Sequence, residues 1–116
     1  LAQSDIISVH APLNEHTEGL IDSSAFGKMK SSCIFLNLGR GPIVDEKALY
    51  DALVGNQIAA AGLDVLCEEP MSADNPLLQI KDSKRLLITP HIAWASVEAR
   101  THLMEIIHGQ VKDFFA

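Results

Sequence analysis

Residues 33–42 read CIFLNLGRGP, an apolar run that ends in an asparagine and a glycine-rich turn. Nearly continuous apolarity, rather than alternation, is typical of a strand buried on both faces of a parallel sheet. The runs 6–9, 59–66 and 86–88 share this property, although 59–66 begins with alanines, which are poor strand formers. The sequence therefore predicts four short parallel strands, the second of them at 33–36.

Helical patterns lie between and after these runs. Asp22 is placed to cap a helix that contains Phe26 and Met29, whereas Asp45 and Ser96 are placed to cap two longer helices. The apolar stripes of the two longer helices are Ala48, Leu49, Ala52 and Leu53 in the first, and Met104, Ile107, Val111 and Phe114 in the second. Residues 68–83 contain two prolines among polar residues and are predicted to be a long loop. Alternating strands and helices indicate an α/β fold with right-handed β-α-β units.

Length, charge and cysteine content narrow the class of protein. The chain has 116 residues, the size of one domain, and 9 basic against 15 acidic residues give a net charge of −6. This balance argues against a general binder of nucleic acid or of anionic membranes, and no apolar run approaches the roughly 18 residues of a transmembrane helix. Two cysteines, Cys33 and Cys67, favour reduced thiols in a cytoplasmic protein. Because the chain starts at Leu1 rather than at a methionine, we expect a fragment of a longer protein.

Chemically active side chains follow the predicted strands at the points where the strands end. His10 follows the first strand, Arg40 the second, Asp64 and Glu69 the third, and His91 the fourth. In open parallel sheets, ligands bind outside the carboxyl ends of the strands. A histidine beside a carboxylate is a general acid–base, and an arginine nearby binds a substrate carboxylate. Such a site suits proton transfer to a 2-keto acid, whereas redox chemistry there would need a cofactor.

Each of these residues also has an ordinary structural interpretation. An arginine between two glycines is typical of a surface turn, a glutamate before a proline of a solvated loop, and a histidine after a proline of a packed or capping residue. Asp64 is equally suited to capping a turn. Their joint occurrence at one sheet edge favours a site. The sequence has no phosphate-binding loop, nucleophile elbow or HExxH helix, and its Cys and His spacing predicts no metal site.

Five motifs stand in one order and cover essentially the whole chain. They are SVHAPL (8–13), NLGRG (37–41), GLDV (62–65), EEP (68–70) and TPHI (89–92). Together they resemble the D-isomer-specific 2-hydroxyacid dehydrogenases, and the ending HIAWAS (91–96) looks most like the glycerate dehydrogenase, or hydroxypyruvate reductase, branch. The resemblance implies a partial Rossmann-like, doubly wound parallel sheet with flanking helices. In it, residues 1–116 would form the second half of the NAD-binding domain.

The resemblance also implies a role for each matching residue. Arg40 would bind the substrate carboxylate and keto oxygen, His91 would protonate that oxygen, and Glu69 would pair with His91. Glu68 is the less favoured partner, because the family motif places the acid next to the proline. Trp94 would either shape the small-acid pocket or pack at the entry to the last helix. The implied cofactor-binding residues, which reach the adenosine, the ribose or the nicotinamide carboxamide, are His10, Pro12, Thr17, Leu38, Gly39 and Asp64.

The implied function is reduction of a 2-keto acid, such as hydroxypyruvate, to a D-2-hydroxy acid with NAD(H) or NADP(H). The residue that selects between NAD and NADP lies upstream in the family, so the choice stays open. The implied enzyme is a homodimer, and we expect the fragment to be inactive alone and to self-associate through uncovered apolar surface. The alternative is an NAD-sensing corepressor of the same fold family, which binds peptide partners.

Overall fold

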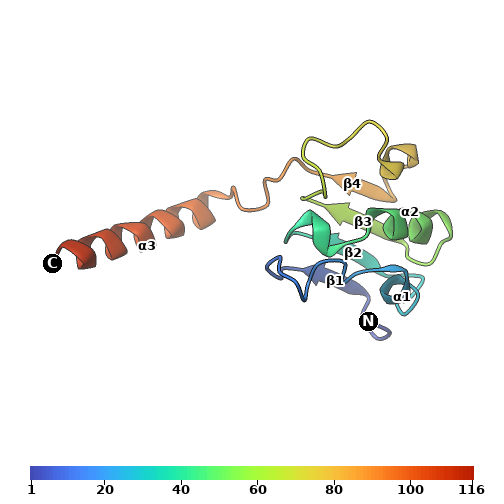
Figure 1. Ribbon diagram of the computed structural model, residues 1–116, viewed down its shortest axis with the longest axis horizontal. Helices are drawn as coiled ribbons and strands as arrows, with labels where there is room; N and C mark the ends of the chain where they lie inside the picture. Colours follow the sequence, from blue (N-terminus) through green and yellow to red (C-terminus); the bar gives the residue numbers. More distant parts are fainter.

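Parallel strands form the framework of the compact part of the computed structural model, which describes residues 1–116, and the last helix projects from this part (Figure 1). The strands are β1 (Ile6–Val9), β2 (Ile34–Asn37), β3 (Ala60–Leu63) and β4 (Leu86–Ile88), and they lie in the order β1-β2-β3-β4. The predicted parallel strands are thus confirmed. The second is shifted by one residue, and the third is shorter than the apolar run 59–66, because the chain leaves the sheet at Asp64.

The helices are α1 (Ser23–Phe26), α2 (Glu46–Val54) and α3 (Val97–Phe115), with short 3-10 helices η1 (Gly41–Ile43) and η2 (Pro76–Gln79). The predicted caps are confirmed. Asp22, Asp45 and Ser96 accept hydrogen bonds from backbone amides in the first turns of α1, α2 and α3, respectively.

Two local predictions need correction. Helix α1 has a single turn and ends before Met29, which is nevertheless buried, so its apolar side chain packs from the following turn. The predicted loop at 68–83 contains η2, whose first turn is capped by Asn75 and whose Leu77 is buried against the core. In both places, tertiary packing buries an apolar side chain, Met29 or Leu77, that lies outside a regular α-helix.

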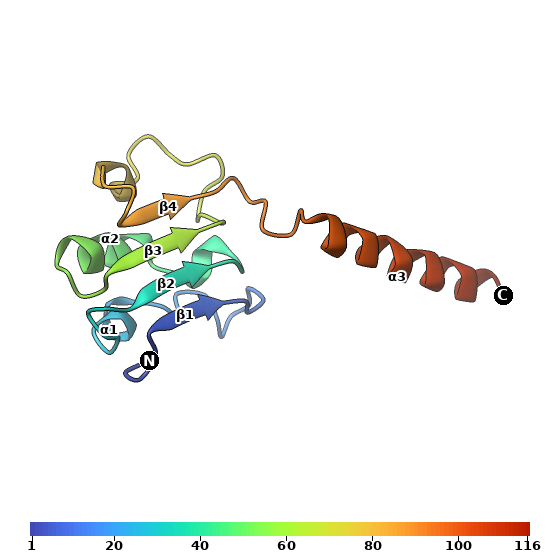
Figure 2. The same cartoon turned by 180° about the vertical axis from the view of Figure 1, so that it is seen from behind.

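One face of the sheet carries the hydrophobic core. Helices α1 and α2 contact one another over this face (Figure 2), and Phe26 of α1 meets Phe35 of β2 edge to face at 5.3 Å between ring centroids. The side chains of Leu49 and Leu53 on α2 and of Ile43 on η1 are fully buried in the same cluster. This packing fixes the carboxyl ends of β1, β2 and β3 relative to one another.

The opposite face of the sheet and the last helix are uncovered. Ile6, Ile34 and Leu87 point from this face and are exposed. Helix α3 extends away from the sheet and has no buried residue, so its apolar stripe packs against nothing in this chain (Figures 1 and 2). None of the helices is both long enough and apolar enough to span a membrane.

Arg85, just before β4, joins the end of α2 to the sheet. Its guanidinium donates to the backbone oxygens of Leu53 at 2.6 Å, Ala59 at 2.7 Å and Ile58 at 3.2 Å. It also donates to Oδ1 of Asn56 at 2.9 Å. A cation at a helix C-terminus satisfies carbonyls that have no partner within the helix and complements the helix dipole.

Arg85→Met, which keeps the apolar stem and removes the donors, should therefore destabilise the fold by about 2 kcal/mol. Urea unfolding followed by circular dichroism measures this change. Lys84→Met is the matched control, because the Lys84 side chain is exposed and makes no hydrogen bond. Equal midpoints for the two variants would contradict the role of Arg85.

Candidate active site

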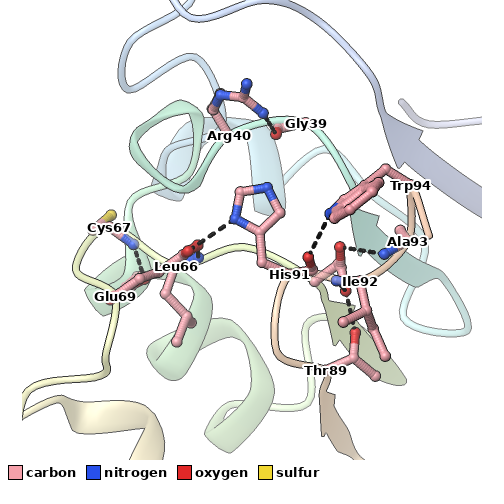
Figure 3. Close-up of polar contacts among 12 residues, drawn as sticks. Gly39, Arg40, Leu66, Cys67, Glu69, Thr89, His91, Ile92, Ala93 and Trp94 are labelled. Carbon is pink, nitrogen blue, oxygen red and sulfur yellow. Dashed lines mark hydrogen bonds and ion pairs between the residues drawn. The ribbon is translucent and has the colours of Figure 1, made fainter. Parts of the chain in front are cut away.

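The carboxyl ends of the strands bring together three of the residues predicted from the sequence. Asp64, Glu69 and His91 line one hollow of about 340 Å³. Arg40 lies on the turn after β2 at the same edge of the sheet (Figure 3). The rule that parallel strands place their ends at one edge was sufficient to predict this grouping.

Glu69 and His91 form a hydrogen-bonded pair. Glu69 Oε2 lies 2.9 Å from Nδ1 of His91, and Glu69 Oε1 accepts from the backbone amide of Leu66 at 3.0 Å (Figure 3). The Leu66 amide, followed by the hydrogen bond to His91, lowers the pKa of the Glu69 carboxyl, so this group is ionised at neutral pH. Both side chains are about two-fifths exposed, and Nε2 of His91 makes no hydrogen bond within the chain. The pair therefore presents a free imidazole nitrogen to a ligand.

His91 stands in a left-handed backbone conformation, with φ of 56°. A non-glycine residue adopts this conformation at a cost in energy, so the surrounding structure must hold it. Trp94 does so from one side, because its indole Nε1 donates to the His91 oxygen at 2.9 Å (Figure 3). The Trp94 ring is 59% exposed. Its contact with the His91 turn accords with packing at the entry to α3, and a role in shaping the acid pocket stays a prediction.

Asp64 holds the same turn from the other side. Its carboxylate accepts from Thr89 Oγ1 at 2.5 Å and from the amides of Ile92 and Ala93 at 2.9 and 2.8 Å. Burial alone would raise the pKa of Asp64, but these hydrogen bonds outweigh it and the pKa is lowered. Sequence reasoning offered turn capping only as an alternative for Asp64 and missed that the turn carries His91. These three hydrogen bonds fill three of about four acceptor positions on the Asp64 carboxylate. Contact between Asp64 and a nicotinamide carboxamide stays a prediction.

Asn37 fixes the turn that carries Arg40. Its buried side chain accepts from the Gly39 amide at 3.1 Å and donates to the Arg40 oxygen at 3.0 Å. The Arg40 guanidinium donates to the Gly39 oxygen at 3.0 Å and has no carboxylate partner in the chain. An exposed, unpaired guanidinium on a rigid turn is suited to bind a carboxylate from solution.

A second hollow, of about 460 Å³, lies at the ends of β1 and β2. Its lining includes four of the predicted cofactor-binding residues: His10, Pro12, Leu38 and Gly39. Thr17 is not part of this lining, but its hydroxyl donates to the Pro12 oxygen at 2.7 Å and so fixes the loop that forms the wall. The structure thus divides the predicted residues between two hollows, and Arg40 belongs to the lining of the second.

Sequence reasoning missed the contacts that Gly41 and Glu46 make with the peptide between Leu66 and Cys67. Gly41 packs directly on the peptide between Leu66 and Cys67, and Glu46 accepts a hydrogen bond from the Cys67 amide at 2.7 Å. Cys67 lies 26 positions after Gly41 and 21 positions after Glu46 along the chain. No local pattern signals such contacts.

The family model for the NAD-binding domain of D-isomer specific 2-hydroxyacid dehydrogenases matches residues 1–93. The chain belongs to this dehydrogenase family. The match ends at the turn that carries His91, just before α3. It confirms the resemblance on which the family assignment from the sequence rested, and it includes every predicted catalytic and cofactor-binding residue, whereas Trp94 lies just beyond it.

Curated relatives in this dehydrogenase family cover nearly the whole chain. The hydroxypyruvate reductase of Blautia hydrogenotrophica is 46% identical over 114 residues, which are 98% of this chain and 34% of the relative. The glycerate dehydrogenase of Methylorubrum extorquens is 42% identical over 116 residues, all of this chain and 37% of the relative. The chain therefore spans about a third of the length of the curated relatives it matches.

Solved structures share the dehydrogenase fold. An acyclic imino acid reductase, Bsp5, in complex with NADPH and D-Arg has a TM-score of 0.85 at 35% identity, over 98% of this chain and 35% of that one. D-lactate dehydrogenase with NAD+ from Lactobacillus jensenii has a TM-score of 0.79 at 36% identity, over 91% of this chain and 35% of that one. The predicted α/β, Rossmann-like class is thereby confirmed.

Proposed function

We propose that this chain is the second half of the NAD-binding domain of an oxidoreductase that interconverts a 2-keto acid and a D-2-hydroxy acid, with hydroxypyruvate and glycerate as the substrate pair. One observation carries the proposal: the His91–Glu69 pair, 2.9 Å apart, stands at the same sheet edge as the unpaired Arg40. This arrangement joins a proton donor to an anion-binding group. The names of the hydroxypyruvate reductase and glycerate dehydrogenase relatives support the substrate pair.

The residues present fit a bound dinucleotide. The hollow of about 460 Å³ at the ends of β1 and β2 falls in the size range of ligand sites. Gly39 belongs to its lining, and a Cβ there would come 3.0 Å from the Ala11 oxygen, so the absence of a side chain lets the ends of β1 and β2 pack closely beside the hollow. His10, Pro12, Leu38 and Gly39 would hold the cofactor, with Thr17 supporting Pro12 and Asp64 reaching the nicotinamide side. Both NAD and NADP are compatible with these residues.

The chain's own side chains would act on the keto acid in three ways. Arg40 binds the substrate carboxylate through two parallel N–H groups and polarises the C2 oxygen. His91 donates its Nε2 proton to that oxygen, and in the reverse direction takes it back. Glu69 accepts a hydrogen bond from Nδ1, which orients the ring and stabilises its protonated form. The cofactor, when bound, supplies the hydride that C2 receives.

The uncovered apolar surfaces and the two thiols bear on the assembly and the location of the enzyme. The exposed apolar face of the sheet and the apolar stripe of α3 support a homodimeric enzyme in which further polypeptide covers both. With these surfaces uncovered and only part of the cofactor site present, the isolated chain would be inactive. The reduced thiols expected from the cysteine content support a cytoplasmic location.

A chimera tests the activity. These 116 residues replace the matching segment of the Blautia hydroxypyruvate reductase, and NADH and NADPH oxidation are followed with hydroxypyruvate, glyoxylate and pyruvate. We expect fast turnover with hydroxypyruvate. A folded chimera that binds NADH but reduces none of the three acids would refute the proposal and favour the corepressor-like alternative.

Arg40→Lys in this chimera should raise KM for hydroxypyruvate about tenfold or more, because one ammonium cannot reproduce a guanidinium fork. The kcat should change less than KM, since His91 and Glu69 are untouched. Lys28→Arg, the reverse exchange at an exposed position outside both hollows, is the control. An unchanged KM for Arg40→Lys would contradict the proposed role in carboxylate binding.

A further inference from the structure

We propose that Glu46 is a positioning residue for the acid–base pair: it ties down the loop that carries Glu69, so that Glu69 meets His91. The inference rests on the function proposed above and adds to it a residue outside the two hollows. Glu46 is the first residue of α2 and touches neither His91 nor the proposed substrate. Its effect would pass through the loop, by way of the Cys67 amide and the Asn75 side chain.

The Glu46 carboxylate joins two distant points of this loop. Oε1 accepts from the Cys67 amide at 2.7 Å, and Oε2 accepts from Nδ2 of Asn75 at 2.6 Å. Cys67 and Asn75 lie on either side of Glu69 along the chain. One carboxylate on a rigid helix thus fastens both ends of the segment that holds the catalytic carboxylate. The capping of α2 is carried by Asp45, so Glu46 is not needed for that purpose.

The constraint reaches Glu69 through adjacent peptide groups. The amide held by Glu46 belongs to Cys67, and the preceding amide, of Leu66, donates to Glu69 Oε1 at 3.0 Å. The other oxygen of Glu69 meets His91 Nδ1 at 2.9 Å. A shift of residues 66–67 would therefore displace Glu69 from His91. The Leu66 amide is also the largest cause of the lowered pKa of Glu69, so the same shift would return that pKa toward its ordinary value.

A glutamine at position 46 is a sharp probe of this arrangement. The Cys67 amide and Asn75 Nδ2 are both donors, and glutamine offers one oxygen where glutamate offers two. Asn75 cannot turn its own oxygen toward position 46 without cost, because Oδ1 already accepts from the Leu77 amide at 2.9 Å. Glu46→Gln keeps the size of the side chain and breaks one of the two ties.

Cys67 reports on the charge at position 46 independently of catalysis. Cys67 is exposed as a residue, but desolvation of its thiol, followed by the nearby Glu46 charge, raises the pKa of that thiol to about 12, so the thiol is protonated at neutral pH. Removing the charge at position 46 should lower that pKa and speed the reaction of Cys67 with a disulfide reagent. Cys33 is buried and contributes little to the signal.

The experiment compares Glu46→Gln with Glu68→Gln in the chimera. Glu68 is an exposed carboxylate of the same loop that makes no hydrogen bond. For Glu46→Gln we expect kcat to fall about tenfold to a hundredfold at unchanged KM for hydroxypyruvate, the size of effect that a small misplacement of a catalytic group produces. We also expect faster labelling of Cys67. The acid side of the kcat profile should move to higher pH, because a carboxylate with a raised pKa is lost earlier as pH falls. Glu68→Gln should change none of these quantities.

The outcomes separate this inference from the function on which it rests. If the parent chimera reduces no keto acid, the proposed function fails and the inference fails with it. If the parent is active and Glu46→Gln labels faster but keeps its kcat, only the inference is overturned. A merely structural role would lower kcat, raise KM and lower thermal stability together, and it would leave the acid side of the kcat profile at the same pH. Should Glu46→Gln not fold, Asn75→Asp, which keeps the oxygen that accepts from Leu77, must lower kcat in the same way.

Discussion

His91→Gln is expected to lower the kcat of keto-acid reduction by about a hundredfold to ten-thousandfold, the usual contribution of a general acid. Glutamine can donate a hydrogen bond to the substrate oxygen, but it cannot give up a proton at any pH that the protein tolerates. The Leu66 amide would still hold Glu69 in place and lower its pKa, but the Glu69 carboxylate would have no imidazolium to stabilise. Binding of NADH and of the acid should change much less than kcat.

The left-handed backbone at position 91 calls for a second variant whose side chain tolerates this conformation. Histidine and asparagine tolerate this conformation better than most residues, so His91→Asn should share the catalytic defect with less strain. His108→Gln, on exposed α3, controls for loss of a histidine elsewhere. Kinetics with hydroxypyruvate, together with NADH binding by fluorescence, measure the effect. Near-normal turnover in His91→Gln or His91→Asn would remove His91 from the mechanism.

The parts of the fold that the sequence predicted are those decided by neighbouring residues. The caps at Asp45 and Ser96 and the stripe of α2 follow from helical spacing, and the strands follow from short apolar runs. Met29 was assigned to a helix because it is apolar at the right spacing, whereas in the structure tertiary packing buries it from a turn. The stripe of α3 is a correct helical pattern, but a pattern cannot specify what the helix packs against.

The site divides in the same way. Glu69, His91 and Arg40 could be placed at one edge because each follows a parallel strand, and strand direction alone brings them together. The support around them could not be predicted. Asp64 reaches the turn at 89–93 across 25 or more positions, and Glu46 reaches Cys67 across 21. These contacts depend on loop conformations that no local period encodes.

Gly41→Ala is expected to produce the largest effect of any glycine-to-alanine substitution in the chain. A Cβ at position 41 would lie 1.9 Å from the Leu66 oxygen, 2.0 Å from the Leu66 carbonyl carbon and 2.4 Å from the Cys67 nitrogen. All three are backbone atoms, so no side chain can rotate aside. The clash pushes apart the turn that carries Arg40 and the loop that carries Glu69. We expect kcat/KM for hydroxypyruvate to fall about a hundredfold and stability to fall by about 1–3 kcal/mol.

Gly109→Ala provides the control, because a Cβ there meets nothing within 4 Å and alanine favours the helix. The kinetic pattern distinguishes Gly41→Ala from the other variants. Arg40→Lys should act mainly on KM and Glu46→Gln mainly on kcat, whereas Gly41→Ala displaces both groups and should change both constants. If Gly41→Ala left both constants and the unfolding midpoint unchanged, the Arg40 turn could not rest on the Leu66–Cys67 peptide. The coupling between the anion-binding turn and the acid–base loop would then be absent.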